Sequence, residues 1–135
     1  MRSASCLITG GCLLLVGCSD FQPAKTASTG GYQLQLKTDP APLMVGQNAA
    51  VTFSIRDGIN QPVTDCKIHF RQYMPGHEMS LDKVQVPLID EAKVGDYYGR
   101  SGEFSMGGDW VLEFDFVCGA DHYTQPFDFH LEWPE

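Results

Sequence analysis

The chain has 135 residues, which allows one domain, and it carries a formal net charge of −8 at pH 7. A negative balance of this size argues against nucleic acid as a partner, because phosphates are bound by basic surfaces. It also argues against electrostatic adhesion to anionic lipid head groups.

The N-terminal segment has the features of a bacterial lipoprotein signal. Arg2 supplies a short positive region, and the uncharged run 6–16 follows it. This run is shorter than the roughly 20 apolar residues of a membrane-spanning helix. Leu15-Val16-Gly17-Cys18 then has the form of a lipobox. We therefore expect cleavage before Cys18 and diacylation of its thiol, with an uncleaved signal anchor as the alternative.

This processing predicts three parts: a signal peptide at 1–17, a lipidated cysteine with a flexible linker at 18–31, and a globular domain at 32–135. Loss of Arg2 with the signal would make the net charge −9. The lipid would tether the domain in the cell envelope, facing the periplasm. Ser19 stands where an Asp marks inner-membrane retention in some bacteria, which favours the outer membrane.

The five cysteines divide by position. Cys6 and Cys12 would leave with the signal, and Cys18 would carry lipid. Only Cys66 and Cys118 remain in the exported domain, and an even pair in an oxidising compartment predicts a disulfide. A two-cysteine metal site is the alternative, although neither residue belongs to a C-x-x-C pair.

Alternation of apolar and polar residues with period two dominates the rest of the chain. It predicts strands at about 32–37, 49–55, 64–73, 84–88, 97–104, 110–118 and 127–133. In the clearest of them, Trp110, Phe114 and Cys118 share one face, whereas Glu113 and Asp115 share the other. No segment shows a helical period. The fold class is therefore all-β, an antiparallel immunoglobulin-like β-sandwich of about seven strands.

The same alternation places both remaining cysteines. Cys66 shares a face with Ile68 and Phe70, and Cys118 shares one with Phe116. Both thiols should point into the core, where a bridge can join the third and sixth predicted strands. This differs from the bridge of antibody domains, which joins the second and sixth strands.

The segment Met74-Pro75-Gly76-His77 fits a type II β-turn, with Pro at its second position and Gly at its third. Such a turn brings Met74 and His77 together, and Met79 would lie on the same face of a following strand. Two thioethers and an imidazole suit Cu(I) better than hard cations, and Met106 is a candidate fourth ligand. The alternative interpretation is packing, with Met74 continuing the core-facing row of the third strand.

The other histidines carry weaker signals. His69 lies on an outward strand face, and His122 lies in a polar loop. His130 alternates outward beside Asp128 and Glu132, where a Zn(II) or Cu(II) site is conceivable but has no diagnostic spacing.

Motifs typical of enzymes are absent from the sequence. Gly99-Arg100-Ser101-Gly102 lacks the second spacer of a nucleophile elbow, and Gly107-Gly108 lacks the Lys-Ser/Thr continuation of a phosphate loop. We therefore predict no catalytic activity.

Several short segments, in their order and spacing, resemble the YtkA-like/FixH-like family of bacterial exported domains over about residues 32–118. These segments are 42–48, 57–63, 73–77, 95–98 and 104–110. The resemblance implies an immunoglobulin-like sandwich with a non-enzymatic role in the envelope. FixH-type members are linked to assembly of copper-containing respiratory oxidases but carry a transmembrane anchor, whereas this chain has a lipobox.

Two functions follow from these observations. The first is a binding or assembly module that contacts another envelope protein. The second is a copper-handling protein that holds Cu(I) through Met74, His77 and Met79.

Overall fold

The computed structural model describes residues 25–77, 86–90 and 94–134. All regular structure in these ranges is β-strand, and none of it is a helix that could span a membrane. The predicted signal peptide at 1–17, the lipidation site Cys18 and the candidate ligand Met79 lie outside the described residues.

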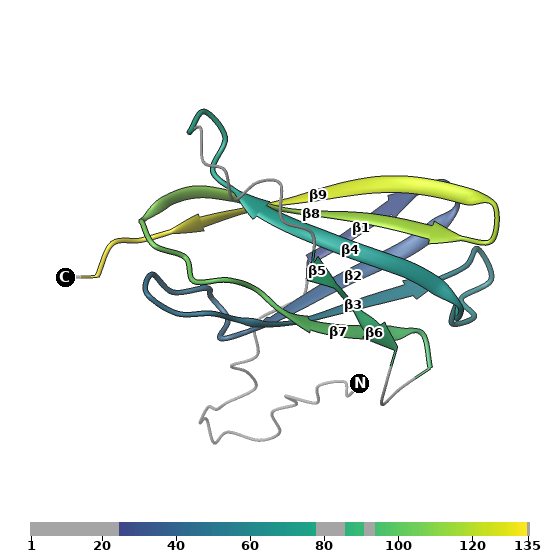
Figure 1. Cartoon of the computed structure of the whole chain (residues 1–135). Coiled ribbons are helices and arrows are strands. Elements are labelled where there is room, and N and C mark those ends of the chain that lie inside the picture. The colour runs from purple at the N-terminus through teal and green to yellow at the C-terminus, as the bar shows by residue number, and fades with distance from the viewer. Residues whose placement is uncertain (1–24, 78–85, 91–93, 135) are drawn as a thin grey trace, which may run out of the picture.

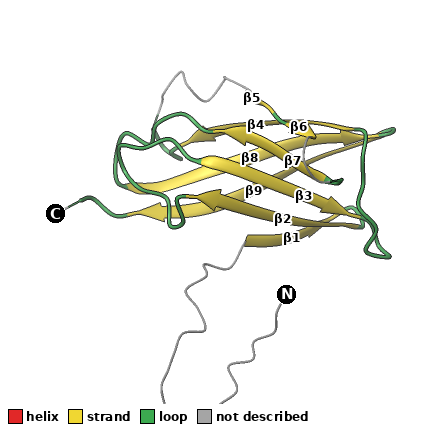
Figure 2. Ribbon diagram, turned by 90° about the horizontal axis from the view of Figure 1, so that it is seen from below, coloured by secondary structure: helices red, strands yellow, loops and turns green. Residues whose placement is uncertain are grey.

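Within these ranges, nine strands form two antiparallel sheets that pack face to face (Figures 1 and 2). The five-stranded sheet has the order β1 (Lys25–Thr29), β2 (Tyr32–Asp39), β3 (Ala50–Arg56), β7 (Asp96–Arg100), β6 (Ile89–Asp90). The four-stranded sheet has the order β5 (Val86–Pro87), β4 (Cys66–Tyr73), β8 (Gly108–Cys118), β9 (Asp121–Leu131). The prediction of an antiparallel, immunoglobulin-like β-sandwich is thus confirmed.

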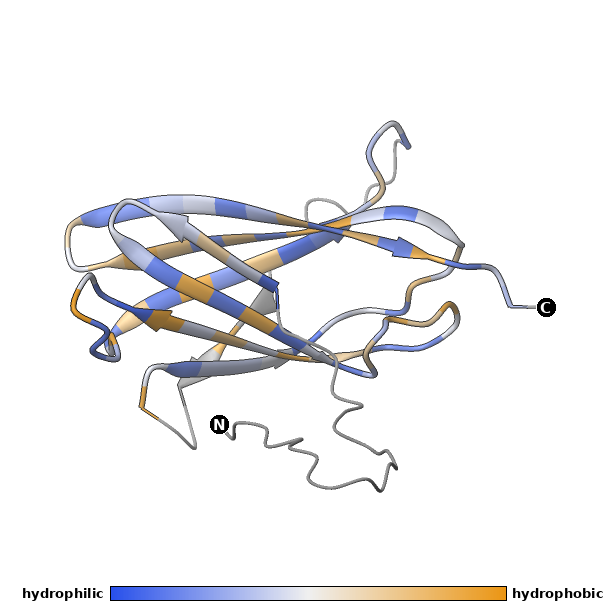
Figure 3. Ribbon diagram, turned by 180° about the vertical axis from the view of Figure 1, so that it is seen from behind, coloured by the Kyte–Doolittle hydropathy of each residue, from blue (hydrophilic) through white to orange (hydrophobic). Residues whose placement is uncertain are grey.

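Aromatic side chains fill the space between the sheets. Phe53 of β3 stacks on Phe114 of β8, with ring centroids 4.5 Å apart and an interplanar angle of 3°. Phe70 of β4 stacks on the same Phe114 at 5.2 Å. Hydrophobic and hydrophilic residues alternate along the strands in Figure 3, as a sheet with one buried face requires. The core therefore follows from the alternation seen in the sequence.

The predicted linker at 18–31 is wrong in its second half, because Lys25–Thr29 forms β1. Gly30 and Gly31 connect β1 to β2 with φ values of 58° and 87°. Two consecutive residues with positive φ make the tight turn that matches the twist of a hairpin, and Gly adopts them without strain. Six residues then separate Cys18 from Lys25, a distance of at most about 25 Å when fully extended.

Other predicted boundaries also shift. The strand expected at 84–88 is divided between β5 and β6, because the chain crosses from one sheet to the other at Leu88. The strand expected to begin at Phe127 begins at Asp121, after a two-residue turn whose Gly119 has φ 66°. It also ends earlier, so Trp133 lies beyond β9 and is 60% exposed instead of facing the core.

The two sheets are linked to each other at both lateral sides of the sandwich. On one side, the crossing at Leu88 joins the sheets, and its amide N–H donates to the Ile68 carbonyl at 3.0 Å. On the other side, β1 lies against β9, where Thr29 Oγ1 donates to Gln125 Oε1 at 2.5 Å. Lys25 Nζ lies 4.7 Å from the centre of the Phe129 ring on the same side. The two sheets are thus linked at both sides, while β1 and β9 remain the edge strands of their sheets.

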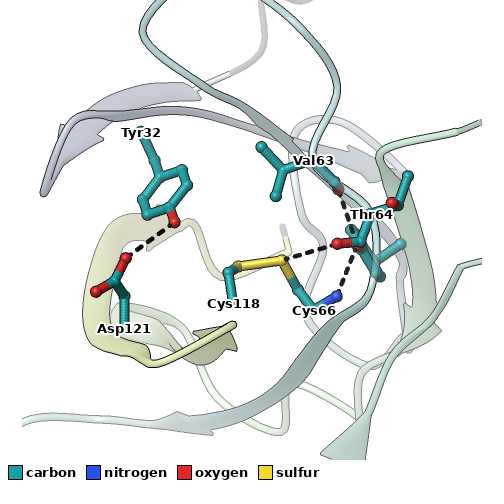
Figure 4. Close-up of a disulfide and its surroundings, with 7 residues drawn as sticks. Tyr32, Val63, Thr64, Cys66, Cys118 and Asp121 are labelled. Atoms are coloured by element: carbon teal, nitrogen blue, oxygen red, sulfur yellow. Dashed lines mark hydrogen bonds between the residues drawn. A yellow bond between two sulfur atoms is a disulfide. The ribbon is translucent and has the colours of Figure 1, made fainter.

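The predicted disulfide between Cys66 and Cys118 is present (Figure 4). It joins directly paired residues of β4 and β8, so it lies within one sheet and not between the two sheets. Tyr97 anchors the same end of β4 from the opposite sheet. Its hydroxyl accepts from the Cys66 amide at 3.2 Å and donates to the Val63 carbonyl at 2.9 Å.

Removing this disulfide should destabilise the domain. The bridge closes a loop of 52 residues in sequence, and cross-links of this size stabilise by about 2–4 kcal/mol. We expect Cys66→Ala/Cys118→Ala to lower the free energy of unfolding by that amount in urea titrations followed by tryptophan fluorescence. Reduction of the unmodified protein should produce the same loss. A change smaller than about 0.5 kcal/mol in both experiments would contradict this role.

Candidate functional site

The Met74–His77 segment forms the predicted type II turn. The His77 amide donates to the Met74 carbonyl at 3.1 Å, and Gly76 has φ 84°, which a type II turn requires at its third position. The two candidate ligands have different environments. The Met74 side chain is 4% exposed and belongs to the core, whereas His77 is exposed to solvent.

Met74 packs against the start of β8, which follows the candidate ligand Met106 in the sequence. A Cβ atom added at Gly108 would lie 2.9 Å from Met74 Cε, so the absence of a side chain there makes room for the thioether. Met106 is half-buried against the core, and its carbonyl accepts from Trp110 Nε1 at 2.9 Å. Met74 and Met106 thus come from adjoining segments, as the copper hypothesis requires, but Met74 is in use as packing.

Three segments contact the segment 101–108 at this end of the sandwich: the loop after β2, the turn after β4 and the segment after β9. The Gly46 amide donates to the Phe104 carbonyl at 2.8 Å and ties the loop after β2 to this segment. Gly107 lies directly against the Trp133 ring, where an added Cβ would be 2.6 Å from Cδ1. We call this surface the methionine end and define it as Met44, Met74, His77, Met106 and Trp133.

Sequence reasoning missed two members of this surface. Met44 is 49% exposed and Trp133 is 60% exposed, which are large values for apolar side chains. Trp133 was placed in the predicted strand 127–133 by alternation alone. Met44 had one usable signal, because it lies in the apolar triplet 43–45 that follows two closely spaced prolines and precedes Gly46. Its proximity to the segment 101–108 is a tertiary feature that no local pattern encodes.

His130 lies among carboxylates, but on an open surface. Its Nδ1 lies 2.7 Å from Asp109 Oδ1, and its Nε2 lies 3.4 Å from Glu132 Oε2. The hydrogen bond with Asp109 raises the pKa of the imidazole, which favours the protonated form and therefore competes with metal binding. Among the described residues, no three His, Cys, Asp or Glu side chains are grouped as a metal site.

A polar network lies on the outer face of the four-stranded sheet. Glu113 accepts from Arg71 Nη2 at 2.6 Å and from the Tyr73 hydroxyl at 2.9 Å. The hydrogen bond with Glu113 raises the pKa of Arg71, while burial, followed by the same carboxylate, raises that of Tyr73. Both groups are held in their ordinary protonation states. The network therefore braces β4 against β8 and shows no sign of acid–base chemistry.

The fold and the site define a disulfide-braced, immunoglobulin-like β-sandwich with its loops gathered at a methionine-containing end. The chain belongs to the YtkA-like family, whose model matches residues 26–115. This confirms the resemblance seen in the sequence. No curated protein sequence matches the chain.

Solved structures show a similar fold at low sequence identity. The PmoD soluble domain from Methylocystis sp. ATCC 49242 (Rockwell) is 14% identical with a TM-score of 0.50, covering 82% of this chain and 98% of that domain. A DUF4785 family protein from Legionella pneumophila is 17% identical with a TM-score of 0.50, covering 76% of this chain. The match spans only 29% of the Legionella protein. At these identities, the likeness concerns the fold alone.

The environments of Met74 and His77 predict that truncating the two side chains will change the stability of the domain by very different amounts. Met74→Ala should lower the free energy of unfolding by about 2–5 kcal/mol, because it leaves a cavity against Gly108. His77→Ala should change it by less than about 0.5 kcal/mol, because the imidazole is exposed. Urea unfolding of the two variants and the unmodified protein measures both changes in the free energy of unfolding. Equal effects would show that Met74 is not part of the core.

Proposed function

We propose that this protein is a non-catalytic binding module of the bacterial cell envelope, tethered by lipid at Cys18 and facing the periplasm, with the outer membrane as the favoured location. In this proposal the methionine end contacts another envelope protein. The lipobox-like segment before Cys18 and membership of the YtkA-like family support the setting.

The observation that carries the proposal is the exposure of Met44, on a loop that hydrogen bonds hold in place, and of Trp133, whose ring lies against Gly107. Asn48 Nδ2 donates to the Ser101 carbonyl at 3.1 Å, and the Phe104 amide donates to the Gln47 carbonyl at 3.2 Å. Met and Trp are enriched in protein interfaces, and Trp is among the residues that carry most binding energy. Apolar side chains presented on a fixed framework bind a partner with little loss of conformational entropy.

The local chemistry is that of a scaffold. The Ser101 hydroxyl accepts from the Ala49 amide at 2.8 Å and donates to the Gly102 carbonyl at 2.8 Å. Both hydrogen bonds are structural, because they join the residue before β3 to the segment that follows β7. Cys66 and Cys118 are joined in the disulfide. These arrangements support a role without covalent catalysis.

Photo-crosslinking in cells tests the binding proposal. A photoreactive amino acid placed at 44 or 133 in the full chain should yield one adduct with the same envelope protein. The matched control is position 67, which is exposed on the outer face of the four-stranded sheet, well outside the methionine end. Identical adducts from 67, or none from 44 and 133, would contradict the proposed contact surface.

A second candidate function is Cu(I) binding at the same end. It is favoured by Met74 and Met106, which come from adjoining segments at the end of the sandwich that carries the turn with His77, because thioethers and imidazole form a soft ligand set. Met79 is a further candidate by sequence. Binding would require Met74 to leave its position against Gly108, so copper would compete with packing.

Competition with a weak Cu(I) chelator tests this candidate on the full chain in detergent. Since loss of outer-shell partners already costs about 10–100-fold in metal affinity, Met74→Ala and His77→Ala should each weaken binding at least about tenfold. His122→Ala is the matched control, because His122 is also exposed but lies near the start of β9, at the end of that strand remote from the methionine end. Failure to compete, or equal losses in all three variants, would remove the copper function.

A further inference from the structure

A hollow of about 380 Å³ lies on the outer face of the five-stranded sheet. β2 and β3 form its floor, β1 lies on one side, and the loops before β4 and β7 supply the other walls. Its volume falls within the range of small-molecule sites, which is roughly 300–1,000 Å³. The side chains that matter here are Gln33, Gln35, Lys37, Ser54, Arg56 and Asp96.

Two cations in this hollow form no ion pair with any residue that the structure describes. Within the described ranges, the ion pairs involve Arg71 and His130, and none involves Lys37 or Arg56. The nearest carboxylate in the lining, Asp96, accepts from Ser54 Oγ at 2.7 Å. Lys37, Arg56 and Asp96 give the lining of the hollow a net charge of +1, which is opposite in sign to the −8 of the chain as a whole.

Strand register arranges these groups in rows. Gln35, Ser54 and Asp96 lie side by side across β2, β3 and β7 and form a neutral and acidic middle row. Arg56 lies beside Gln33 on one side of that row, and Lys37 lies beside Thr52 on the other. Since Thr52 and Arg56 are four residues apart on β3, the two cations flank the row at about 13 Å along the strands, at roughly 3.3 Å per residue.

We propose that this hollow binds a small organic anion whose body carries hydroxyl groups, of the class of sugar phosphates and sugar acids. Arg56 would hold the phosphate or carboxylate in the two-pronged manner that its guanidinium favours. The Gln33 and Gln35 amides, each both donor and acceptor, would bind the hydroxyls. Lys37 would attract the anion from the far side of the hollow. This site is separate from the methionine end, so its test does not depend on the outcome for the partner-binding proposal.

Calorimetry and amide chemical shifts of the full chain in detergent test the site. The probes are glucose 6-phosphate and glucuronate, with glucose and inorganic phosphate as reference compounds. We expect both anionic sugars to bind and to shift amides of β2 and β3, and glucose to bind at least about tenfold more weakly, as expected for loss of a charged hydrogen bond. Whichever anionic sugar binds more tightly identifies the anionic group.

Three variants distinguish binding in the hollow from non-specific attraction of an anion to positive side chains. Arg56→Gln and Lys37→Gln should each weaken binding about tenfold. Lys67→Gln removes the same charge from the opposite sheet and should leave binding unchanged. Thermal melts of all three confirm folding. The proposal is overturned if neither anionic sugar binds, if glucose binds as tightly, or if Lys67→Gln has the same effect. Binding of inorganic phosphate as tight as that of the sugars would mean an adventitious ion only, and would also overturn it.

Discussion

The stacking of Phe114 between Phe53 and Phe70 is the contact on which the rest of the structure depends. All three rings are essentially inaccessible to solvent, and complete burial of a phenyl side chain stabilises a fold by about 1.5–3 kcal/mol. Phe53 comes from one sheet and Phe114 from the other, so this contact sets which faces meet. Because side chains alternate along a strand, the inward direction of Phe70 and Phe114 fixes which other residues of β4 and β8 face the core.

This constraint reaches both ends of the sandwich. Toward one end, the inward row that contains Phe70 and Phe114 continues to Cys66 and Cys118, which explains why the thiols meet. Toward the other end, the same row of β4 continues into Met74, which is why the thioether is buried while His77 is not. The exposed Trp133 ring lies against Gly107, beside the Gly108 that Met74 contacts. The core therefore lies directly beneath the proposed contact surface, and copper binding by Met74 would disturb its packing.

Strand alternation was sufficient to predict the parts of the fold that depend on burial. β8 and the inward cysteines were predicted because Trp110, Phe114 and Phe116 have a single interpretation on a half-buried strand. β1 was missed because its residues are mostly polar and exposed, although Gly30-Gly31 is a recognisable hairpin turn. Trp133 was misplaced because alternation cannot show where a strand ends. The convergence of Met44 with the segment 101–108, and the hollow between β1 and β7, arise from tertiary packing and strand order.

The central claim is that Met74 belongs to the core whereas Met44 forms the contact surface. Methyl NMR of ¹³C-labelled methionines, with a soluble paramagnetic agent, measures this directly. The account predicts strong signal loss for the Met44 methyl, a smaller loss for the half-buried Met106, and almost none for Met74. Attenuation of Met74 as strong as that of Met44 would contradict it, because the thioether would then be open to solvent and free to bind a metal.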